Sequence, residues 1–433
     1  MNPPAGGSLS TSGLPRVVRG PLVWLRTRFD GPWRAFACDD RPVEPVARIM
    51  VFTALALLAI GLLMVYSASS ARALSIVGDD GVLFRRQVKW AVGAVVVLFV
   101  MMRVPPATVA RWSKWVGVAA VIGLIWLFLA RWVPALQGNA PSINGARRWL
   151  VMGPVRFQVG ELAKIVMIVI LAARLSTLGG RATEVVRGVL VTGAIVVVPT
   201  LLVQQQPDLG TAALIGSVGL VMMLVGGVQL RRLMIFAPFV APIVAWNLLE
   251  RWDTILRRFA PFIGRGGGDD DALHQLTQSL MALGAGGWFG RGVGAGRQKL
   301  FYLPEAQTDF ILPVVGEELG FVGTSLVVIL FMIFVTCGLR IVLAAAARSG
   351  FLYLLTLGIV LTIGMQATLN IAVVTGSAPT KGIPLPFVSL GGSSLLTLSA
   401  ALGIVYAAAR ELDRRAPMPT PTSHEAATAE VAS

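Results

Sequence analysis

The segment QKLFYLPEAQTDFILPVVGEELG, residues Gln298–Gly320, runs from a polar loop into an apolar stretch and carries four carboxylates across that junction. Asp309 lies directly before the apolar stretch, which begins at Phe310, and Glu317 and Glu318 lie within its first turns. Ionisable side chains at membrane depth are costly, so they usually face a cavity or a partner and mark function. A carboxylate at the start of a helix is also favoured by the helix dipole without any further role. The segment alone permits both interpretations.

Hydrophobic residues make up 55% of the 433-residue chain and charged residues 14%, which is typical of an integral membrane protein. Ten segments are apolar and long enough, at about 20 residues, to cross a bilayer as helices. The sequence therefore predicts an all-α integral membrane fold with ten transmembrane helices. The predicted spans are residues 47–69, 87–104, 113–134, 159–178, 187–204, 210–228, 232–249, 309–339, 351–375 and 393–411.

The predicted spans divide the chain into a membrane domain, residues 47–411, and two tails. The N-terminal arm, residues 1–46, is polar and precedes an apolar run too long for a signal peptide, so we expect no cleavable signal. Its arginines favour the cytoplasm, and an even number of spans then returns the C-terminus to the same side. Residues 412–433 are expected to form a disordered cytoplasmic tail. The connection between spans seven and eight, residues 250–308, becomes a large extracytoplasmic loop.

The loops expected on the outer side are more basic than orientation alone would favour. They include Arg72, Arg85, Arg86, Lys89, Arg147, Arg148, Arg156, Arg251, Arg257, Arg258, Arg265, Arg291, Arg297 and Lys299. Guanidinium and ammonium groups bind phosphate oxygens, so this distribution favours a phosphate-bearing partner there. General attraction to anionic lipid headgroups is the simpler explanation for scattered basic residues. The carboxylates expected in the same compartment shift the balance toward a site.

Several catalytic machineries are missing from the sequence. The chain has two histidines, His274 in the large loop and His424 in the tail, and two cysteines, Cys38 and Cys337. No Gly-x-Ser-x-Gly elbow, P-loop or CxxC cluster is present, so we expect no acyl transfer, nucleotide hydrolysis or organic cofactor. The remaining carboxylates and arginines suit transfer of a sugar from a phosphate leaving group. In that reaction a carboxylate deprotonates the acceptor hydroxyl while cations neutralise the departing phosphate.

Four separated blocks resemble, in the right order, the SEDS family, the polytopic enzymes of shape, elongation, division and sporulation. They are NGARRWLVMGPVRFQVGELAK at 144–164, QQPDLGTA at 205–212, QLTQSLMALGAGGWFGRGVGAGRQKLFYLPEAQTDFILPVVGEELGFVG at 275–323, and PTKGIPLPFVSLGGSSLL at 379–396. Blocks and spans together cover residues 45–411. The third block looks closer to the division members of the family than to the elongation members.

The resemblance implies an inner-membrane peptidoglycan glycosyltransferase of ten spans that polymerises lipid II at the outer leaflet. Asp309 matches the essential aspartate of the family, and it would take the proton from the 4-hydroxyl of the acceptor GlcNAc. Attack on the donor MurNAc would then expel undecaprenyl pyrophosphate. The sequence departs from the family pattern at Gln307 and Leu312, where a histidine and an aromatic residue are common. Because Thr308-Asp309-Phe310 is intact, we expect catalysis to be retained.

Further residues are expected to bind the substrate. Arg148, which a tryptophan follows, matches an arginine typical of the family and suits an interfacial pyrophosphate site. Glu161 and Lys164 lie three residues apart on one helix face, so they either pair with each other or direct Lys164 toward the diphosphate. Arg86 with Gln87 resembles a family arginine–glutamine pair at the start of the second span.

The predicted substrate-binding set contains five more polar residues. Asp208 opens the sixth span, where helix capping is a complete explanation and a substrate or cation contact is the alternative. Lys381 lies in a Pro- and Gly-rich segment, whose irregular backbone is tolerated in a membrane where it lines a cavity or packs on protein. Ser393 belongs to a run of small residues that offers either polar contacts or close helix packing. Lys299 and Glu305, in the large outer loop, complete the set.

The resemblance also favours a divalent cation, Mg²⁺ or Mn²⁺, held by Asp309 and substrate phosphates rather than by a dedicated protein cage. It implies lipid II, membrane lipid, a class B penicillin-binding transpeptidase and other division proteins as partners, and no nucleic acid. The expected location is the bacterial inner membrane, at the division septum. A lipid II flippase would suit the spans and the intramembrane charges too. A non-catalytic division scaffold is a third hypothesis.

Overall fold

A computed structural model describes residues 41–142, 145–153, 155–179, 182, 184–234, 241, 245, 249, 270–297, 305–379 and 382–415. Helices dominate this part of the chain. Their bounds are α3 Glu44–Val77, α4 Val82–Met101, α5 Pro106–Leu129, α6 Val159–Leu178, α7 Val191–Gln204, α8 Leu209–Val225, α9 Leu230–Leu233, α12 Asp270–Ala285, α13 Ile311–Arg348, α14 Gly350–Val374 and α15 Gly392–Arg414. A 3₁₀ turn, Pro134–Asn139, follows α5, and a π-helical turn, Val185–Leu190, leads into α7.

Nine of the ten predicted spans coincide with a described helix, with ends that differ by several residues. The remaining one, 232–249, lies for the most part outside the described residues. Within the described ranges, six helices are long and apolar enough to cross a membrane. Helices α4 and α6 are also 20 residues long, but each carries three charged side chains. The structure is thus a multi-pass helical bundle, and the count of ten spans stays a prediction.

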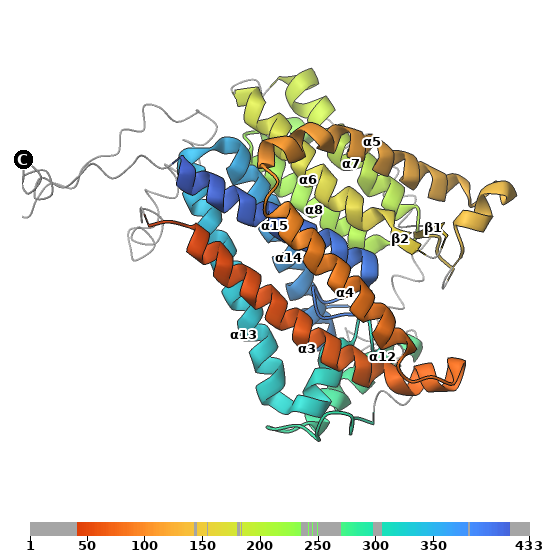
Figure 1. Ribbon diagram of the computed structural model, residues 1–433. Helices are drawn as coiled ribbons and strands as arrows, with labels where there is room; N and C mark the ends of the chain where they lie inside the picture. The colour runs from red at the N-terminus through yellow and green to blue at the C-terminus, as the bar shows by residue number, and fades with distance from the viewer. Residues whose placement is uncertain are drawn as a thin grey trace, which may run out of the picture.

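The bundle has two sides. Helices α3 and α13 pack against each other along one side, and α5, α6, α7 and α8 gather on the other, with α14 and α15 between them (Figure 1). Helix α4 packs mainly on α15 and α3.

The predicted arm at 1–46 and tail at 412–433 fall largely outside the described residues, although α3 begins within the arm and α15 continues to Arg414.

Three features of the structure were not predicted, and the first, a β-hairpin, corrects the all-α prediction. Strands β1 (Trp149–Met152) and β2 (Val155–Gln158) form a short antiparallel hairpin directly before α6, with Trp149 opposite Gln158. Helix α12 lies inside the predicted outer loop and packs on α13. Helix α13 is broken at Gly320, whose φ of 69° only glycine adopts readily. Hydrophobic periodicity does not reveal these features, because each depends on contacts with distant parts of the chain.

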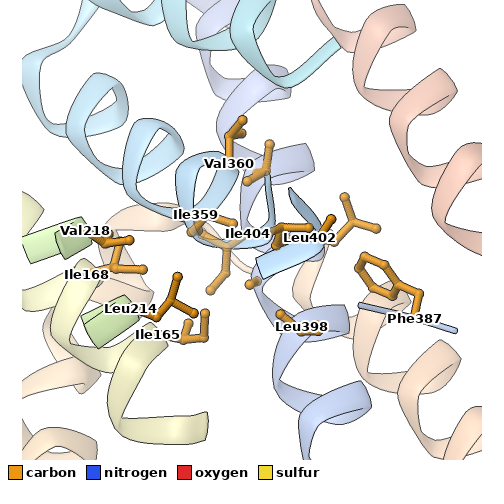
Figure 2. Close-up of a cluster of buried hydrophobic side chains, with 14 of the residues drawn as sticks. Ile165, Ile168, Leu214, Val218, Ile359, Val360, Phe387, Leu398, Leu402 and Ile404 are labelled. Atoms are coloured by element: carbon orange, nitrogen blue, oxygen red, sulfur yellow. The ribbon is translucent and has the colours of Figure 1, made fainter. Parts of the chain in front are cut away.

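The apolar core lies between α6, α8, α14 and α15, where Ile168, Val218, Ile359 and Leu402 are buried against one another (Figure 2). Close approach of the helices requires a small residue at Gly358. A Cβ there would lie 2.5 Å from Ile168 and 2.6 Å from the sulfur of a neighbouring methionine. Lipid tails are as apolar as this core, so tight packing at small residues, rather than exclusion of water, holds such helices together.

Candidate active site

Asp309 lies at the end of a turn that precedes α13, and its side chain is half-buried. Glu305 opens the turn with a φ of 56°, a backbone conformation that non-glycine residues rarely adopt. The hydroxyl of Thr308 donates hydrogen bonds to the carbonyl oxygen of Glu305 at 3.1 Å and to its carboxylate at 3.2 Å. The turn therefore fixes Glu305 and Asp309 on the same short segment.

The segment 382–391, here called the proline loop, holds this turn in place from the opposite side. Leu390 N donates to the carbonyl oxygen of Gln307 at 2.9 Å, and the Ser389 hydroxyl donates to the carbonyl oxygen of Thr308. Asn370 of α14 joins the two segments, because its Nδ2 donates to the carbonyl oxygens of Asp309 (2.8 Å) and Ile383 (2.7 Å). Asp309 is thus positioned by its own backbone contacts.

Gly382 lies directly against the carboxylate of Asp309. A Cβ at this position would lie 2.7 Å from Asp309 Oδ2, closer than any real Cβ comes to an oxygen. The proline loop also contacts the start of α8, since a Cβ at Gly210 would lie 2.9 Å from the Ile383 side chain. Glycines at these two positions let three segments converge on one carboxylate.

The β1–β2 hairpin brings the basic component to this site. Arg148, directly before β1, donates to the carbonyl oxygens of Gln206 (3.3 Å) and Pro207, and its guanidinium lies 4.0 Å from Asp208 Oδ2. Gln158, at the end of β2, donates to the same carboxylate oxygen at 3.4 Å. The other oxygen of Asp208 accepts from the backbone N–H of Thr211 at 3.1 Å and so caps α8. The capping role expected for Asp208 is therefore present, together with an ion pair.

The electrostatics of the site act on Asp309. Burial raises the pKa of its carboxyl to about 7, and the negative charges of Glu305 and Asp208 act in the same direction, whereas Arg148 lowers the pKa. The charges of Arg148, Glu305 and Asp208 all act on the pKa of Asp309. The fold has therefore brought four of the predicted site residues together. A carboxyl with this pKa is poised between its acid and base forms near neutral pH, as a general base requires.

Glu161 and Lys164 lie deeper in the bundle and pair with each other. Lys164 is completely buried, and its Nζ lies 3.0 Å from Glu161 Oε2 and 3.0 Å from the side-chain oxygen of Gln366 on α14. Ser394 donates to the same oxygen of Glu161 at 2.9 Å, and Gln366 donates to the carbonyl oxygen of Pro384 at 3.0 Å. The pair thus supports the proline loop through Gln366. Asn370, which also contacts the loop, lies one helical turn, roughly 6 Å, further along α14.

The other predicted residues are distributed differently. Arg86 is exposed on α4, while its neighbour Gln87 is buried and exchanges hydrogen bonds with Ser389 and Gly391 of the proline loop. The hydroxyl of Ser393 is buried and has no hydrogen-bond partner in the described part of the chain. Lys299 and Lys381 lie outside the described residues.

Sequence reasoning missed the amides that organise the site. Gln366 and Asn370 stand four residues apart in α14, so they share one face of an otherwise apolar span. Polar side chains inside a membrane helix commonly bond to neighbouring elements, and this pattern was a usable signal. Gly382 gave no such signal, because its closeness to Asp309 depends on the path of the proline loop.

Glu317 and Glu318 have partners inside the protein. The two carboxylates accept backbone N–H groups from the glycine-rich segment 286–297, with Gly294 N at 2.9 Å from Glu318 and Arg297 N at 2.8 Å from Glu317. Ser67 of α3 donates to both oxygens of Glu318, at 2.6 and 2.7 Å. The Glu317–Glu318 pair therefore fastens the segment before Asp309 to α13 and α3.

A divalent cation would find few protein ligands here. Within the described ranges, no three His, Cys, Asp or Glu side chains are grouped so that they could hold a metal ion. Asp309, and with it Glu305 or Asp208, could supply one or two carboxylate ligands, and Mg²⁺ held in this way would take its other ligands from substrate phosphates and water.

Fold and site together define a polytopic helical membrane protein with a carboxylate and an arginine converging at one end of the bundle. A family model described as cell cycle protein, which covers FtsW, RodA and SpoVE, matches residues 47–414. This chain belongs to that family. The match runs from Ala47, in the first turn of α3, to Arg414 at the end of α15.

Curated relatives cover most of the chain. A probable peptidoglycan glycosyltransferase FtsW from Geobacter sp. (strain M18) is 36% identical over 365 residues, which are 84% of this chain and 97% of the relative. The stage V sporulation protein E of Bacillus subtilis (strain 168) is 36% identical over 368 residues, 84% of this chain and 96% of the relative. Both are full-length matches of the membrane domain.

Solved structures show the same architecture. The crystal structure of the rod shape determining protein RodA of Thermus thermophilus matches with a TM-score of 0.59 at 25% identity, covering 84% of this chain and 96% of that one. A chain from a peptidoglycan synthase complex that coordinates polymerization and crosslinking matches with a TM-score of 0.65 at 24% identity, covering 84% and 97%. The multi-pass helical fold is therefore shared with solved members of the family.

Proposed function

We propose that this chain is a peptidoglycan glycosyltransferase that polymerises lipid II at the outer face of the inner membrane during cell division. Relatives named as probable peptidoglycan glycosyltransferases match over nearly their whole length, which supports the activity. The observation that carries the proposal is Asp309, a half-buried carboxyl with a pKa of about 7 that lies within the field of Arg148. Transfer of a sugar from a pyrophosphate requires a base for the acceptor hydroxyl and a cation for the leaving group.

In the proposed reaction Asp309 accepts the proton of the GlcNAc 4-hydroxyl on the acceptor. The hydroxyl oxygen forms a bond to the anomeric carbon of the donor MurNAc, and the bond from that carbon to the phosphate oxygen breaks. The bonding electrons leave with undecaprenyl pyrophosphate. Arg148 supplies positive charge for the departing group, and the carbonyl oxygens of Gln206 and Pro207 keep its guanidinium oriented. Protonated Asp309 then returns its proton to water.

The remaining predicted residues act at different points of the proposed site. Glu305 raises the pKa of Asp309 through its charge. Glu161 and Lys164 act on the substrate through the proline loop, because both are buried and connect to Pro384 through Gln366. Ser393 stays a candidate for a substrate contact. Asp208 orients Arg148. We include Arg86, Lys299 and Lys381 as candidate pyrophosphate ligands.

Cofactor, partners and location complete the proposal. We include a divalent cation, Mg²⁺ or Mn²⁺, which when bound would neutralise pyrophosphate charge beside Asp309. A solved structural relative belongs to a complex that coordinates polymerization and crosslinking, which supports a class B transpeptidase as partner. We also propose ten spans, cytoplasmic termini and placement at the septum.

A polymerisation assay tests the proposal. The purified chain, with its cognate transpeptidase, is supplied with lipid II and Mg²⁺, and glycan strands are resolved on a gel. We expect Asp309→Asn to reduce polymer formation by roughly 10²- to 10⁴-fold, the usual contribution of a general base, while lipid II binding persists. Asp79→Asn is the matched control, because Asp79 pairs with Arg85 and is not among the residues that act on Asp309.

Two results would contradict the proposal. Undiminished polymer from Asp309→Asn would remove the base from the mechanism. Lipid II translocation in liposomes by a protein that makes no polymer, with or without Asp309, would instead support the flippase hypothesis. A protein that does neither, yet still binds its division partners, would support the scaffold.

A further inference from the structure

An apolar groove with a volume of about 400 Å³ lies between α5, α6 and α7, away from the candidate active site. Its walls are aliphatic, and Lys114 is the one charged side chain among the residues that line it. The residues that matter below are Lys114 and Gly117 of α5, Ala163 and Ile170 of α6, and Ala194 and Pro199 of α7.

The groove runs parallel to the helix axes. Helices α5 and α6 are antiparallel neighbours, because a Cβ at Gly117 would lie 2.6 Å from Ile170 while one at Gly123 would lie 3.2 Å from Val159. Lys114 and Ile170 therefore lie at one end of the groove, and Ala163 lies toward the other. The shape is a slot with a single charged end.

The charged end points away from Asp309. Gln206 Nε2 donates to the carbonyl oxygen of Leu124 at 3.5 Å, which places Leu124 level with the active-site end of the bundle. Lys114 lies ten residues earlier in α5, roughly 15 Å along the axis, and Arg174 lies roughly 22 Å beyond Val159 in α6. The hydrocarbon core of a bilayer is about 30 Å thick, so each half is roughly 15 Å deep. Measured from the active-site end, Lys114 lies near the middle of the membrane, and Arg174 lies in the half opposite the site.

More positive charge continues beyond Lys114. Arg111 is one turn earlier on the same face of α5, and Arg174 is one turn beyond Ile170 on the groove face of α6. Arg174 donates to the carbonyl oxygen of Arg187 at 3.1 Å, which places Arg187 in the same group. The Nε atom of Arg174 is buried and lacks a hydrogen-bond partner among the described residues.

Little negative charge offsets this group. On the described parts of the helices that form the groove, the acidic residue at this end is Glu184, three residues before Arg187. Arg111 and Lys114 are exposed, and neither has a carboxylate within ion-pair distance in the described part of the chain. An apolar slot that ends in unneutralised guanidinium and ammonium groups is complementary to an amphipathic anion.

We propose that the α5–α7 groove binds one anionic glycerophospholipid, with an acyl chain in the slot and its phosphate among Arg111, Lys114 and Arg174. Basic pockets between membrane helices recognise anionic headgroups in this way. Long basic side chains reach the headgroup level by extending along the bundle surface. This lipid is distinct from the proposed substrate, because its phosphate lies among basic residues beyond the middle of the membrane, toward the end of the bundle opposite Asp309.

Native mass spectrometry of the purified full chain tests the lipid site. The delipidated protein is titrated with phosphatidylglycerol and, separately, with phosphatidylcholine of the same chain length. We expect preferential retention of one phosphatidylglycerol molecule. The double variant Arg111→Gln/Lys114→Gln should weaken that retention by roughly fivefold for each charge removed. Both side chains are exposed, so the variant should fold normally, and its thermal unfolding checks this.

Two further variants separate the slot from general surface charge. Ala194→Trp places an indole into the slot from an exposed position on α7 and should weaken retention without a change in charge. Arg103→Gln is the control for the loss of a single charge, because it removes one positive charge from an exposed residue at the same end of the bundle. Arg103 follows α4, which packs on α3 and α15. Equal retention of both lipids, or equal losses in Arg103→Gln and the double variant, would overturn the proposal. Unchanged retention in Ala194→Trp would also overturn it.

Discussion

Asp309 is positioned by neutral groups, and its charge is adjusted by ionised ones. Asn370 and Ser389 hold the backbone of the turn, whereas Glu305 and Arg148 act on the carboxyl itself. Substitution of a residue of the first kind should lower activity, whereas substitution of one of the second kind should shift the pH dependence of activity. The first kind displaces the carboxylate, and the second changes its proton affinity.

The sequence identified the charged residues of this site better than the neutral ones. Asp309, Arg148, Asp208 and Glu305 stood out because charges are scarce in an apolar chain, and the fold brings them together. Asn370 was missed, because an amide inside an apolar span can equally bond within its own helix. Its role depends on the proline loop, whose path no local pattern predicts.

The buried pair of Glu161 and Lys164 gives a prediction about stability. Lys164→Met leaves the carboxylate of Glu161 buried without its cation, and such a loss costs roughly 3 to 5 kcal/mol. The double variant Glu161→Gln/Lys164→Met removes both charges, so we expect its thermal unfolding midpoint to lie well above that of Lys164→Met. The measurement is thermal unfolding of each purified variant in the same detergent.

A double variant as unstable as Lys164→Met would contradict this account of the pair. It would mean that Lys164 stabilises the bundle mainly through Gln366, to which it also donates a hydrogen bond.

At the scale of elements, the proline loop connects α3, α14 and α15 to the turn that carries Asp309. The packing of these helices therefore affects the position of the carboxylate. The loop packs closely against Gly61 of α3, since a Cβ there would lie 2.6 Å from the carbonyl oxygen of Val388. Hydrogen bonds then connect the loop to the turn at Thr308. A helix far from Asp309 in sequence thus sets the position of the carboxylate.

Gly61→Ala should therefore impair both stability and polymerisation. The added methyl group must displace loop backbone, and overpacking of this kind typically costs about 1 to 3 kcal/mol. The control is Gly93→Ala in α4, where a Cβ would lie at an ordinary 3.6 Å from Leu396. That change should be neutral or stabilising, because alanine favours a helix over glycine. Polymerisation rate and thermal unfolding midpoint are measured for both, and equal effects would contradict the role of the loop.

Helices were predictable from the sequence where a long apolar run formed one uninterrupted element. The range 351–375 agrees with α14, Gly350–Val374, to within a residue. The range 309–339 was less accurate, because α13 continues to Arg348 and breaks at Gly320. The break follows from contact with the segment 286–297, where a Cβ at Gly320 would lie 2.3 Å from Gly290 N. Such a contact is not visible in hydrophobic periodicity.

At the scale of the whole molecule, the proposal requires the Asp309 end to face outward. Phe289, in the segment fastened to Glu317 and Glu318, is 85% exposed at that end, and Arg103 is exposed at the other. In a variant without Cys38 and Cys337, we expect Phe289→Cys to react with a membrane-impermeant maleimide in intact spheroplasts. Arg103→Cys should react only after the membrane is permeabilised. Labelling of both positions from one side, or in the reverse order, would contradict the topology.

Two groups of basic residues have separate roles in this account. Arg148 belongs to the active site, whereas Arg111, Lys114 and Arg174 belong to the proposed lipid groove at the other end. Composition alone gives a formal net charge of +15, but it does not show which basic residues act at which site. The three-dimensional arrangement places these two groups of charges toward opposite ends of the helices.

The pH dependence of polymerisation tests the central role of Asp309 most directly. The base form is the ionised carboxylate, so its fraction, and with it kcat/KM, should fall as the pH drops through the raised pKa of about 7. Glu305→Gln removes a negative charge that raises this pKa, so the acidic limb should move to lower pH. We predict a wild-type limb near pH 7 and a downward shift in Glu305→Gln. A wild-type limb near pH 4, the ordinary range of an aspartate, or an unchanged limb in Glu305→Gln would contradict the account.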